Sequence, residues 1–201
     1  KVTDAADDEN SDDPLDLDGQ SFAIINNRNG GDIWHALRDE IDETRDARGY
    51  YMSGNTTAYS NVNGIDYSSA GDVAWTFEYV TTDSSGSYYR ISTSNGYLYI
   101  DPDVTKKSDM PRNSSHDYER ALRLESSAGD GSSADGTLIR VVANSDGTYL
   151  LQNRNGVCLW NYANVFWLST LDKDGESEES KANSRFRLAL LPEPPHEIGR
   201  A

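Results

Sequence analysis

Short runs of alternating apolar and polar residues recur three times along the chain, and each run ends in a polar turn closed by Asn-Gly. A second apolar run follows each turn. Because Asn and Gly tolerate the positive φ of tight hairpin turns, two such runs around Asn-Gly predict a β-hairpin. The three predicted hairpins cover residues 21–37, 87–100 and 147–160.

The spacing of these hairpins is nearly regular. Gly30 and Gly96 lie 66 residues apart, and Gly96 and Gly156 lie 60 residues apart. A period of this kind predicts three copies of one supersecondary unit, whose sheets close on each other around a common core.

Later runs of strand-like residues complete two of the copies. Residues 49–53 and 74–80 are predicted to form the third and fourth strands of the first copy, and residues 165–168 and 185–189 those of the third. Between the first hairpin and residues 49–53, residues 38–48 indicate a short surface helix or an ordered insertion, because only Leu37 and Ile41 share a helical face there.

The second copy has two candidates for its closing strand. Residues 121–125 match 74–78 position by position, whereas residues 138–142 match by their distance to the next hairpin. A loop rich in Gly, Ser and Asp separates them. The sequence leaves both alternatives open, and the two segments could also form one extended hairpin.

Three four-stranded units that open with a hairpin and close with an apolar-x-apolar strand resemble the β-trefoil, an all-β fold, here with polar loop insertions. The segment Gly147-Thr-Tyr-Leu-Leu-Gln-Asn-Arg-Asn-Gly-Val-Cys-Leu159 is similar to ricin-B-like modules. The segment Leu17-Asp-Gly-Gln-Ser-Phe-Ala-Ile-Ile-Asn26 is similar to trefoil-like domains of bacterial surface (adhesin) proteins. The resemblance covers about residues 15–191, with repeats at about 15–82, 86–144 and 147–191. It implies a non-catalytic module, often a sugar binder.

The sugar-binding motifs of ricin-B-like lectins are not intact in this chain. Those lectins end each repeat with Gln-x-Trp, and none of the matching stretches here contains the Gln. They also place an Asp soon after the Cys-Leu pair of the second strand. Here Trp160 follows Cys158 and Leu159, and the nearest acid after Leu98 is Asp101. Lectin activity therefore does not transfer residue by residue.

The composition fits one β domain between two tails. The chain has 201 residues, with 12 Tyr and 4 Trp, and aromatic residues favour strands. Residues 1–14 read as an acidic disordered linker and residues 192–201 as a Pro-rich linker. We therefore expect a monomeric domain of a larger protein that is extracellular or exposed on a cell surface.

The charge and hydropathy patterns exclude two classes of partner. A net charge of −16 repels phosphate backbones and anionic lipids, so nucleic acid is not an expected partner. No apolar run approaches the ~20 residues of a membrane-spanning helix, so no membrane insertion by this segment is expected.

Catalytic motifs are absent from the sequence. The histidines His35, His116 and His196 are far apart, and the sequence contains no nucleophile elbow, phosphate-binding loop or dinucleotide fingerprint. Cys158 lies in an apolar run and is expected to be a buried, inert thiol. We predict that the chain is not an enzyme.

Aromatic side chains near the hairpin ends are the candidate ligand-binding residues, because exposed rings can stack on sugar faces. The alternative for each ring is packing in or beside the core. Trp75, in an alternating strand, is expected in the core. The candidates, with one carboxylate, are Trp34, Tyr99, Asp101, Trp160, Tyr162 and Trp167.

A calcium site is a weaker prediction. Asp172, Asp174 and Glu176 alternate around Gly175, which is part of the oxygen-rich loop that Ca²⁺ requires. The alternative is a solvated acidic loop. No other cofactor is expected.

These features predict a non-catalytic extracellular module of a bacterial surface or secreted protein that recognises glycans. The alternative is a protein-interaction or spacer domain of a cell-surface adhesin, with a host or cell-surface protein as partner and no small-molecule ligand. A hydrolase with loops inserted in the trefoil is the third hypothesis.

Overall fold

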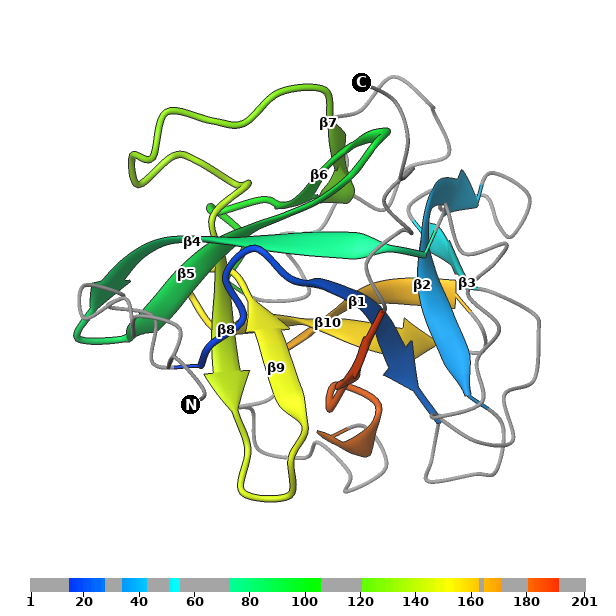
Figure 1. Cartoon of the computed structure of the whole chain (residues 1–201). Coiled ribbons are helices and arrows are strands. Elements are labelled where there is room, and N and C mark those ends of the chain that lie inside the picture. The colour runs from blue at the N-terminus through cyan, green and yellow to red at the C-terminus, as the bar shows by residue number, and fades with distance from the viewer. Residues whose placement is uncertain are drawn as a thin grey trace, which may run out of the picture.

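The structure, a computed structural model, describes residues 15–27, 34–42, 51–54, 73–105, 121–162, 165–170 and 181–191 (Figure 1). These residues form twelve β-strands and no long helix. No helix in this part of the chain has the length and apolar character that crossing a membrane requires. The predicted linkers, residues 1–14 and 192–201, lie outside the described residues.

The twelve strands fall into three groups of four in chain order. The first group is β1 (Ser21–Asn26), β2 (His35–Asp42), β3 (Tyr51–Gly54) and β4 (Trp75–Asp83). The second group is β5 (Gly86–Thr93), β6 (Gly96–Ile100), β7 (Leu122–Glu125) and β8 (Ile139–Ala143). The third group is β9 (Tyr149–Gln152), β10 (Val157–Tyr162), β11 (Val165–Thr170) and β12 (Arg187–Leu190).

The first and last strands of the groups form a closed barrel. β1 pairs with β4 and β12, β4 pairs with β5, β5 with β8, and β8 with β9, all antiparallel. The barrel closes between β9 and the residue before β12. There, the Tyr149 amide donates to the Phe186 carbonyl at 2.7 Å, and the Phe186 amide donates back at 2.9 Å.

The middle strands of the groups form three hairpins: β2 with β3, β6 with β7, and β10 with β11. Six barrel strands and three hairpins related by the repeat define the β-trefoil. The prediction of an all-β trefoil with three four-stranded repeats is confirmed. Figure 1 shows the long β4–β5 hairpin, which joins the first two repeats, and the β8–β9 hairpin, which joins the last two.

The structure decides which segment closes the second repeat. β8 pairs with β5 in the barrel, whereas β7 pairs with β6 in a hairpin. The segment at 138–142 is therefore the closing strand, and 121–125 is the third strand. The sequence match between 121–125 and 74–78 arises because both segments direct alternating apolar residues to the core: Leu122 and Leu124 take the positions of Trp75 and Phe77, and all but the partly buried Leu124 are fully buried.

The short helix considered at 38–48 is wrong for the residues that the structure describes. β2 continues to Asp42, and its pairing with β3 shifts register between Leu37 and Ile41. Such a bulge lets a strand bend without leaving the sheet. Because of this irregularity, β2 lacks the regular alternation of apolar and polar residues from which a strand is predicted.

One core draws side chains from all three repeats. It includes Phe22 and Trp75 from the first repeat, Tyr89 and Leu98 from the second, and Phe166 from the third. The indole N–H of Trp75 donates to the carbonyl of Leu37 at 2.9 Å, so this buried ring loses no hydrogen bond. The predictions that Trp75 lies in the core and that Cys158 is buried are both confirmed.

In the described Asn-Gly turns, the glycine has a positive φ but the asparagine does not, whereas the sequence predicted tight turns with positive φ at both residues. Gly96 and Gly156 have φ of 152° and 82°, but neither Asn95 nor Asn155 has a positive φ. In these two Asn-Gly pairs, only the glycine therefore needs its conformational freedom. Gly96 has a second constraint, because a Cβ there would lie 2.6 Å from the carbonyl oxygen of Glu125.

Substitution of Gly96 by Ala is expected to destabilise the fold more than substitution of Gly147. Gly147 also has positive φ, at 81°, but a Cβ there would meet nothing within 4 Å. Gly147→Ala should cost only the left-handed backbone strain of roughly 1–2 kcal/mol. Gly96→Ala adds the clash with Glu125. Its free energy of unfolding, measured in urea, should therefore fall clearly more than that of Gly147→Ala. Equal losses would contradict the close approach of β6 to β7.

Candidate functional site

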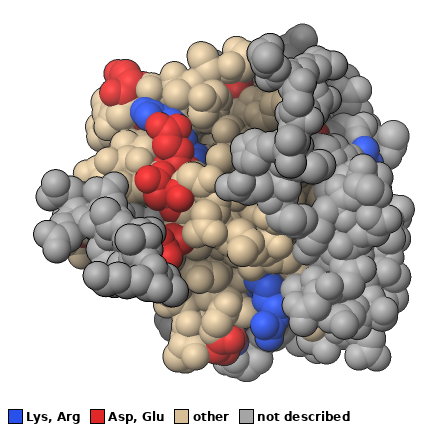
Figure 2. All heavy atoms as spheres, viewed as in Figure 1, with Lys and Arg blue, Asp and Glu red and all other residues tan. Residues whose placement is uncertain are grey.

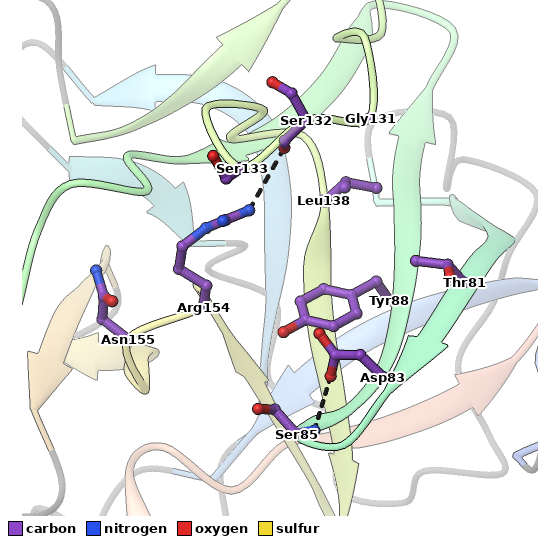
Figure 3. A pocket seen from close by; sticks show the side chains of 10 residues that line it. All are labelled: Thr81, Asp83, Ser85, Tyr88, Gly131, Ser132, Ser133, Leu138, Arg154 and Asn155. Atoms are coloured by element: carbon purple, nitrogen blue, oxygen red, sulfur yellow. Dashed lines mark hydrogen bonds between the residues drawn. The ribbon is translucent and has the colours of Figure 1, made fainter.

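Three chain segments that are distant in sequence meet at an open pocket of about 370 Å³ (Figure 3). The first is the end of the β4–β5 hairpin, the second is the loop before β8, and the third is the β9–β10 turn. The lining residues are Thr81, Asp83, Ser85, Tyr88, Gly131, Ser132, Ser133, Leu138, Arg154 and Asn155. This size lies within the range of ~300–1,000 Å³ typical of small-ligand sites.

The β4–β5 hairpin contributes one wall, and its Tyr88 forms the floor together with Leu138, the residue before β8. The Oδ1 atom of Asp83 accepts hydrogen bonds from the amides of Ser85 at 2.7 Å and Gly86 at 3.2 Å, which fixes the turn and the carboxylate. Nearby, the Tyr88 and Leu138 side chains are only 6% and 7% exposed. They form an apolar floor beneath exposed polar groups (Figure 3).

Asp135 organises the loop that forms the second wall. This buried carboxylate accepts from the amides of Gly131 and Thr137, both at 2.9 Å, and from the Thr137 hydroxyl. Arg90 reaches it at 3.4 Å and also donates to the Gly129 carbonyl. These bonds fold the Gly- and Ser-rich segment into a defined loop, which presents Ser132 and Ser133 to the pocket.

The surroundings of Asp135 stabilise its charged form. Burial works to raise the pKa of this carboxyl. The hydrogen bonds from Thr137, Gly131 and Arg90 outweigh burial and leave the pKa below its ordinary value. The loop is therefore built around a carboxylate that stays ionised.

Asn153 organises the β9–β10 turn. Its Oδ1 accepts from the amides of Asn155 and Val157, both at 2.9 Å. Its Nδ2 donates to the carbonyls of Asp101 at 2.9 Å and Val104 at 2.8 Å. All four hydrogen-bonding positions of this buried amide are filled. The turn is thereby locked, and Arg154, the next residue, is held at the rim of the pocket.

Arg154 has few partners of its own. Its Nη2 donates to the carbonyl of Ser132 at 3.4 Å, which is a long hydrogen bond, shown dashed in Figure 3. Its Nε is buried and has no acceptor among the described residues. No carboxylate in the described part of the chain forms an ion pair with it.

The negative charge of the chain is concentrated in sequence segments other than those that line the pocket. Residues 1–14 hold six acidic residues and one lysine, and residues 172–180 hold five acidic residues and one lysine. On the face shown in Figure 2, acidic side chains form a short row with basic side chains beside them. The pocket itself is lined by one carboxylate, Asp83, and one guanidinium, Arg154.

The pocket is suited to a small polyhydroxylated ligand. Its hydroxyl groups come from Thr81, Ser85, Ser132, Ser133 and Tyr88, and each can donate and accept. Asp83 adds an acceptor, and Arg154 adds donors. An apolar floor with a few converging polar groups is the usual construction of a small-ligand site.

Tyr99 and Asp101, two residues predicted to bind ligand, lie outside the lining of this pocket. The Tyr99 ring is half-buried, and the Arg123 guanidinium covers one face of it at 3.9 Å from the ring centre. Asp101 accepts from the amide of Asp103 at 2.9 Å through its carboxylate. A sugar could stack on that face of Tyr99 only by displacing Arg123.

The other predicted aromatic residues lie on different hairpins. Trp34 is half-buried at the start of β2, with the Arg187 guanidinium 5.7 Å from its ring centre. Trp160 is half-buried on β10, directly opposite Trp167 on β11 in the strand register. For Tyr162 and Trp167 the structure describes the strands but not the side chains.

The predicted calcium ligands Asp172, Asp174 and Glu176 lie outside the described residues. Within the described ranges, no group of three or more His, Cys, Asp or Glu side chains could hold a metal ion. The weak calcium prediction stays a prediction.

The sequence did not predict the pocket residues, because they form neither a ligand motif nor a cluster of aromatic residues at a hairpin end. A usable signal was present in the Asn-Arg-Asn-Gly turn at 153–156, which places an arginine at a hairpin tip. A second signal was Asp135, a single acid in a Gly- and Ser-rich loop that precedes a strand. Neither signal shows that these two loops and the β4–β5 hairpin face one another across a pocket.

No protein-family model matches the sequence, and no curated protein matches it either. Among solved structures, the chain is similar to ThreeFoil, a designed threefold-symmetric protein, with 17% identity, coverage of 85% of this chain and 99% of that chain, and a TM-score of 0.47.

Two further similar structures come from natural proteins. SeviL bound to asialo-GM1 saccharide has 17% identity, covers 85% of this chain and 96% of its own, and gives a TM-score of 0.44. The cytolethal distending toxin of Haemophilus ducreyi has 16% identity, with coverage of 84% of this chain and 82% of that chain and a TM-score of 0.45. The strand pairing of this chain is what assigns it to the β-trefoil fold.

Asp135→Asn is expected to destabilise the protein by about 1–3 kcal/mol at pH 7, because an amide nitrogen would face the donors on Gly131 and Arg90. Asp130→Asn, a substitution at an exposed residue of the same loop, should lower the free energy of unfolding by less. Because the folded pKa of Asp135 is lowered, its contribution is present above the unfolded pKa of about 3.9 and is lost as the pH falls through the folded value. The stability gap between wild type and Asp135→Asn should therefore narrow below about pH 4 in urea unfolding. A gap independent of pH would contradict the ionised carboxylate.

Proposed function

We propose that this chain is a non-catalytic glycan-binding module and that the pocket between Asp83 and Arg154 is its binding site. The observation that carries the proposal is the ring of hydroxyl, amide, carboxylate and guanidinium groups above an apolar floor. A sugar presents the same combination, with apolar C–H faces and a rim of hydroxyl groups.

The two sides of the pocket would hold different parts of the sugar. A pyranose C–H face would pack on Tyr88 and Leu138, which are already mostly buried and lose little freedom on binding. Sugar hydroxyls would donate to the free oxygen of Asp83. The serines of the loop before β8 would complete the rim by donating or accepting as the ligand requires.

The acid–base content of the pocket favours binding over hydrolysis. Glycoside hydrolysis by the usual mechanisms requires two carboxyl groups on either side of the scissile bond. Asp83 is the single carboxyl group among the lining residues. It has no second acid opposite it in the lining, only the guanidinium of Arg154 and hydroxyl groups.

The alternative, a protein-interaction or spacer domain without a small-molecule ligand, is less well supported. A hollow lined with convergent polar groups around an apolar floor is characteristic of small-ligand recognition. A protein-binding surface is typically flatter and carries exposed aromatic anchors. Among the described residues, Leu190 is the single exposed large apolar side chain.

The proposal also includes the setting of the module. We propose that it acts outside the cell, as part of a surface or secreted protein, which is what its acidic N-terminal and Pro-rich C-terminal segments led us to expect. We also propose that Asp172, Asp174 and Glu176 bind calcium.

The first experiment is a glycan array with the full 201-residue chain, in calcium and again with chelator. Reproducible binding to at least one glycan class is expected. Loss of binding with chelator would support the calcium site, and unchanged binding would remove it. An array without any binding would contradict the proposed function and favour a protein partner.

Asp83→Asn is expected to weaken glycan binding by roughly ten- to a hundredfold, the value of a hydrogen bond to a charged group. The amide can keep the Oδ1 contacts to Ser85 and Gly86, so the turn should survive. Asp146→Asn is the matched control, because Asp146 caps the β8–β9 turn through Thr148 and does not line the pocket. Calorimetric titration with the best array ligand gives both affinities. Equal effects of the two substitutions would place the binding site elsewhere.

A further inference from the structure

The pocket contains a cation that no carboxylate among the described residues neutralises. Arg154 carries five N–H donors, and within the described ranges its side chain makes one hydrogen bond, of 3.4 Å, to the Ser132 carbonyl. A chain with 34 acidic and 18 basic residues has many carboxylates with which an arginine could pair. Arg90 and Arg123 do so, with Asp135 and Glu125. Arg154 instead faces the pocket.

A second guanidinium lies close to the same turn. The Nη1 of Arg140 donates to the backbone carbonyl of Arg154 at 3.4 Å, and its Nε donates to Gln152 at 3.0 Å. Neither partner is charged. Two positive charges therefore meet at the β9–β10 turn, Arg154 in the turn and Arg140 on β8 bonded to it, and no described carboxylate pairs with either.

The partial burial of Arg154 makes an unfilled donor set costly. Its Nε is shielded from solvent without an acceptor, and a desolvated donor without a partner is unfavourable. The turn cannot easily move to relieve this, because all four hydrogen bonds of Asn153 fix it. An incoming anion would meet a guanidinium that is already positioned and only weakly engaged.

The charges in the pocket are arranged across it. Figure 3 shows Arg154 reaching toward Ser132 on one side, while Asp83 lies beside Ser85 and Tyr88 on the other. A sugar ring with anionic groups at both of its ends would be repelled by Asp83. A ring with one anionic group at one end and hydroxyl groups at the other, as in a single uronic acid residue, would match both sides.

We infer that the pocket selects acidic glycans, with Arg154 binding the carboxylate of a uronic acid residue and Asp83 accepting from the hydroxyls at the opposite end of the ring. This inference rests on the proposed glycan-binding function and adds the ligand class. A carboxylate suits the planar fork of a guanidinium, which can donate two parallel hydrogen bonds to it. The net negative charge of the chain opposes the approach of anions, but at physiological salt its reach is limited to about 8 Å.

The test is a titration of the full chain with three matched ligands: oligogalacturonate, the same oligomer with its carboxylates methyl-esterified, and a neutral galactose oligomer. The free acid should bind roughly ten- to a hundredfold more tightly than the methyl ester. Its affinity should fall as salt increases, whereas that of the ester should change little.

Arg154→Gln should remove this preference, so that the free acid and the methyl ester bind with similar affinity. Arg154→Lys keeps the charge but not the fork, and should retain part of the preference. Arg187→Gln is the control, because Arg187 is an exposed arginine beside Trp34 and does not line the pocket. Unfolding midpoints equal to wild type would show that the variants are folded.

The outcomes separate this inference from the proposed function. Binding of the neutral oligomer that is lost in Asp83→Asn, with no preference for the free acid, would overturn the acidic ligand class and leave the glycan site intact. A preference lost in Arg187→Gln but kept in Arg154→Gln would also overturn it, because the anion would then bind beside Trp34. Absence of binding to all three ligands and to a glycan array would overturn both.

Discussion

Closure of the six-stranded barrel is the constraint from which the rest of the structure follows. β1 pairs with β4 and β12, and the contact between Tyr149 and Phe186 joins the last open edge. Once the barrel is closed, the hairpin ends have little freedom in where they lie. The β4–β5 hairpin, the loop before β8 and the β9–β10 turn are thus brought to one pocket, although its residues Asp83 and Arg154 are far apart in sequence.

Two polar side chains then give these loops their shape. Asp135 and Asn153 are both buried. The Asp135 carboxylate accepts from two amides of its own loop, from the Thr137 hydroxyl and from Arg90. The Asn153 amide bonds only to backbone groups, of its own turn and of residues 101–104. A buried polar group stabilises a structure when all its hydrogen bonds are made and destabilises it when they are not. Each residue therefore specifies one loop conformation, and the two conformations set the width of the pocket between Ser132 and Arg154.

The sequence was sufficient to predict the repeat architecture. The threefold hairpin pattern is local, since alternating runs and Asn-Gly turns report only on neighbouring residues. This pattern therefore predicted the hairpin that opens each repeat. Together with the regular spacing of the hairpins, it predicted the trefoil. It did not separate β7 from β8, because both bury alternating apolar residues, and the choice depends on whether β5 or β6 lies alongside. It also missed the continuation of β2 past its register shift.

The pocket could not be predicted in the same way. Its residues come from three loops, and no periodicity relates Tyr88, Ser132 and Arg154. The aromatic residues chosen instead lie on hairpins of different repeats, and a guanidinium already covers a face of Tyr99. Loops of a β-trefoil are placed by the barrel, so their contacts appear only when its closure and register are known.

The most direct measurement is an amide shift map by NMR during titration of the full chain with oligogalacturonate. The glycan-pocket account predicts that the largest changes lie in residues 83–88, 131–133 and 154–156, with smaller changes along β6 and β10. Changes centred on Trp34, Tyr99 or Trp160 would place the ligand on the hairpin aromatics, and an unchanged spectrum would contradict the account.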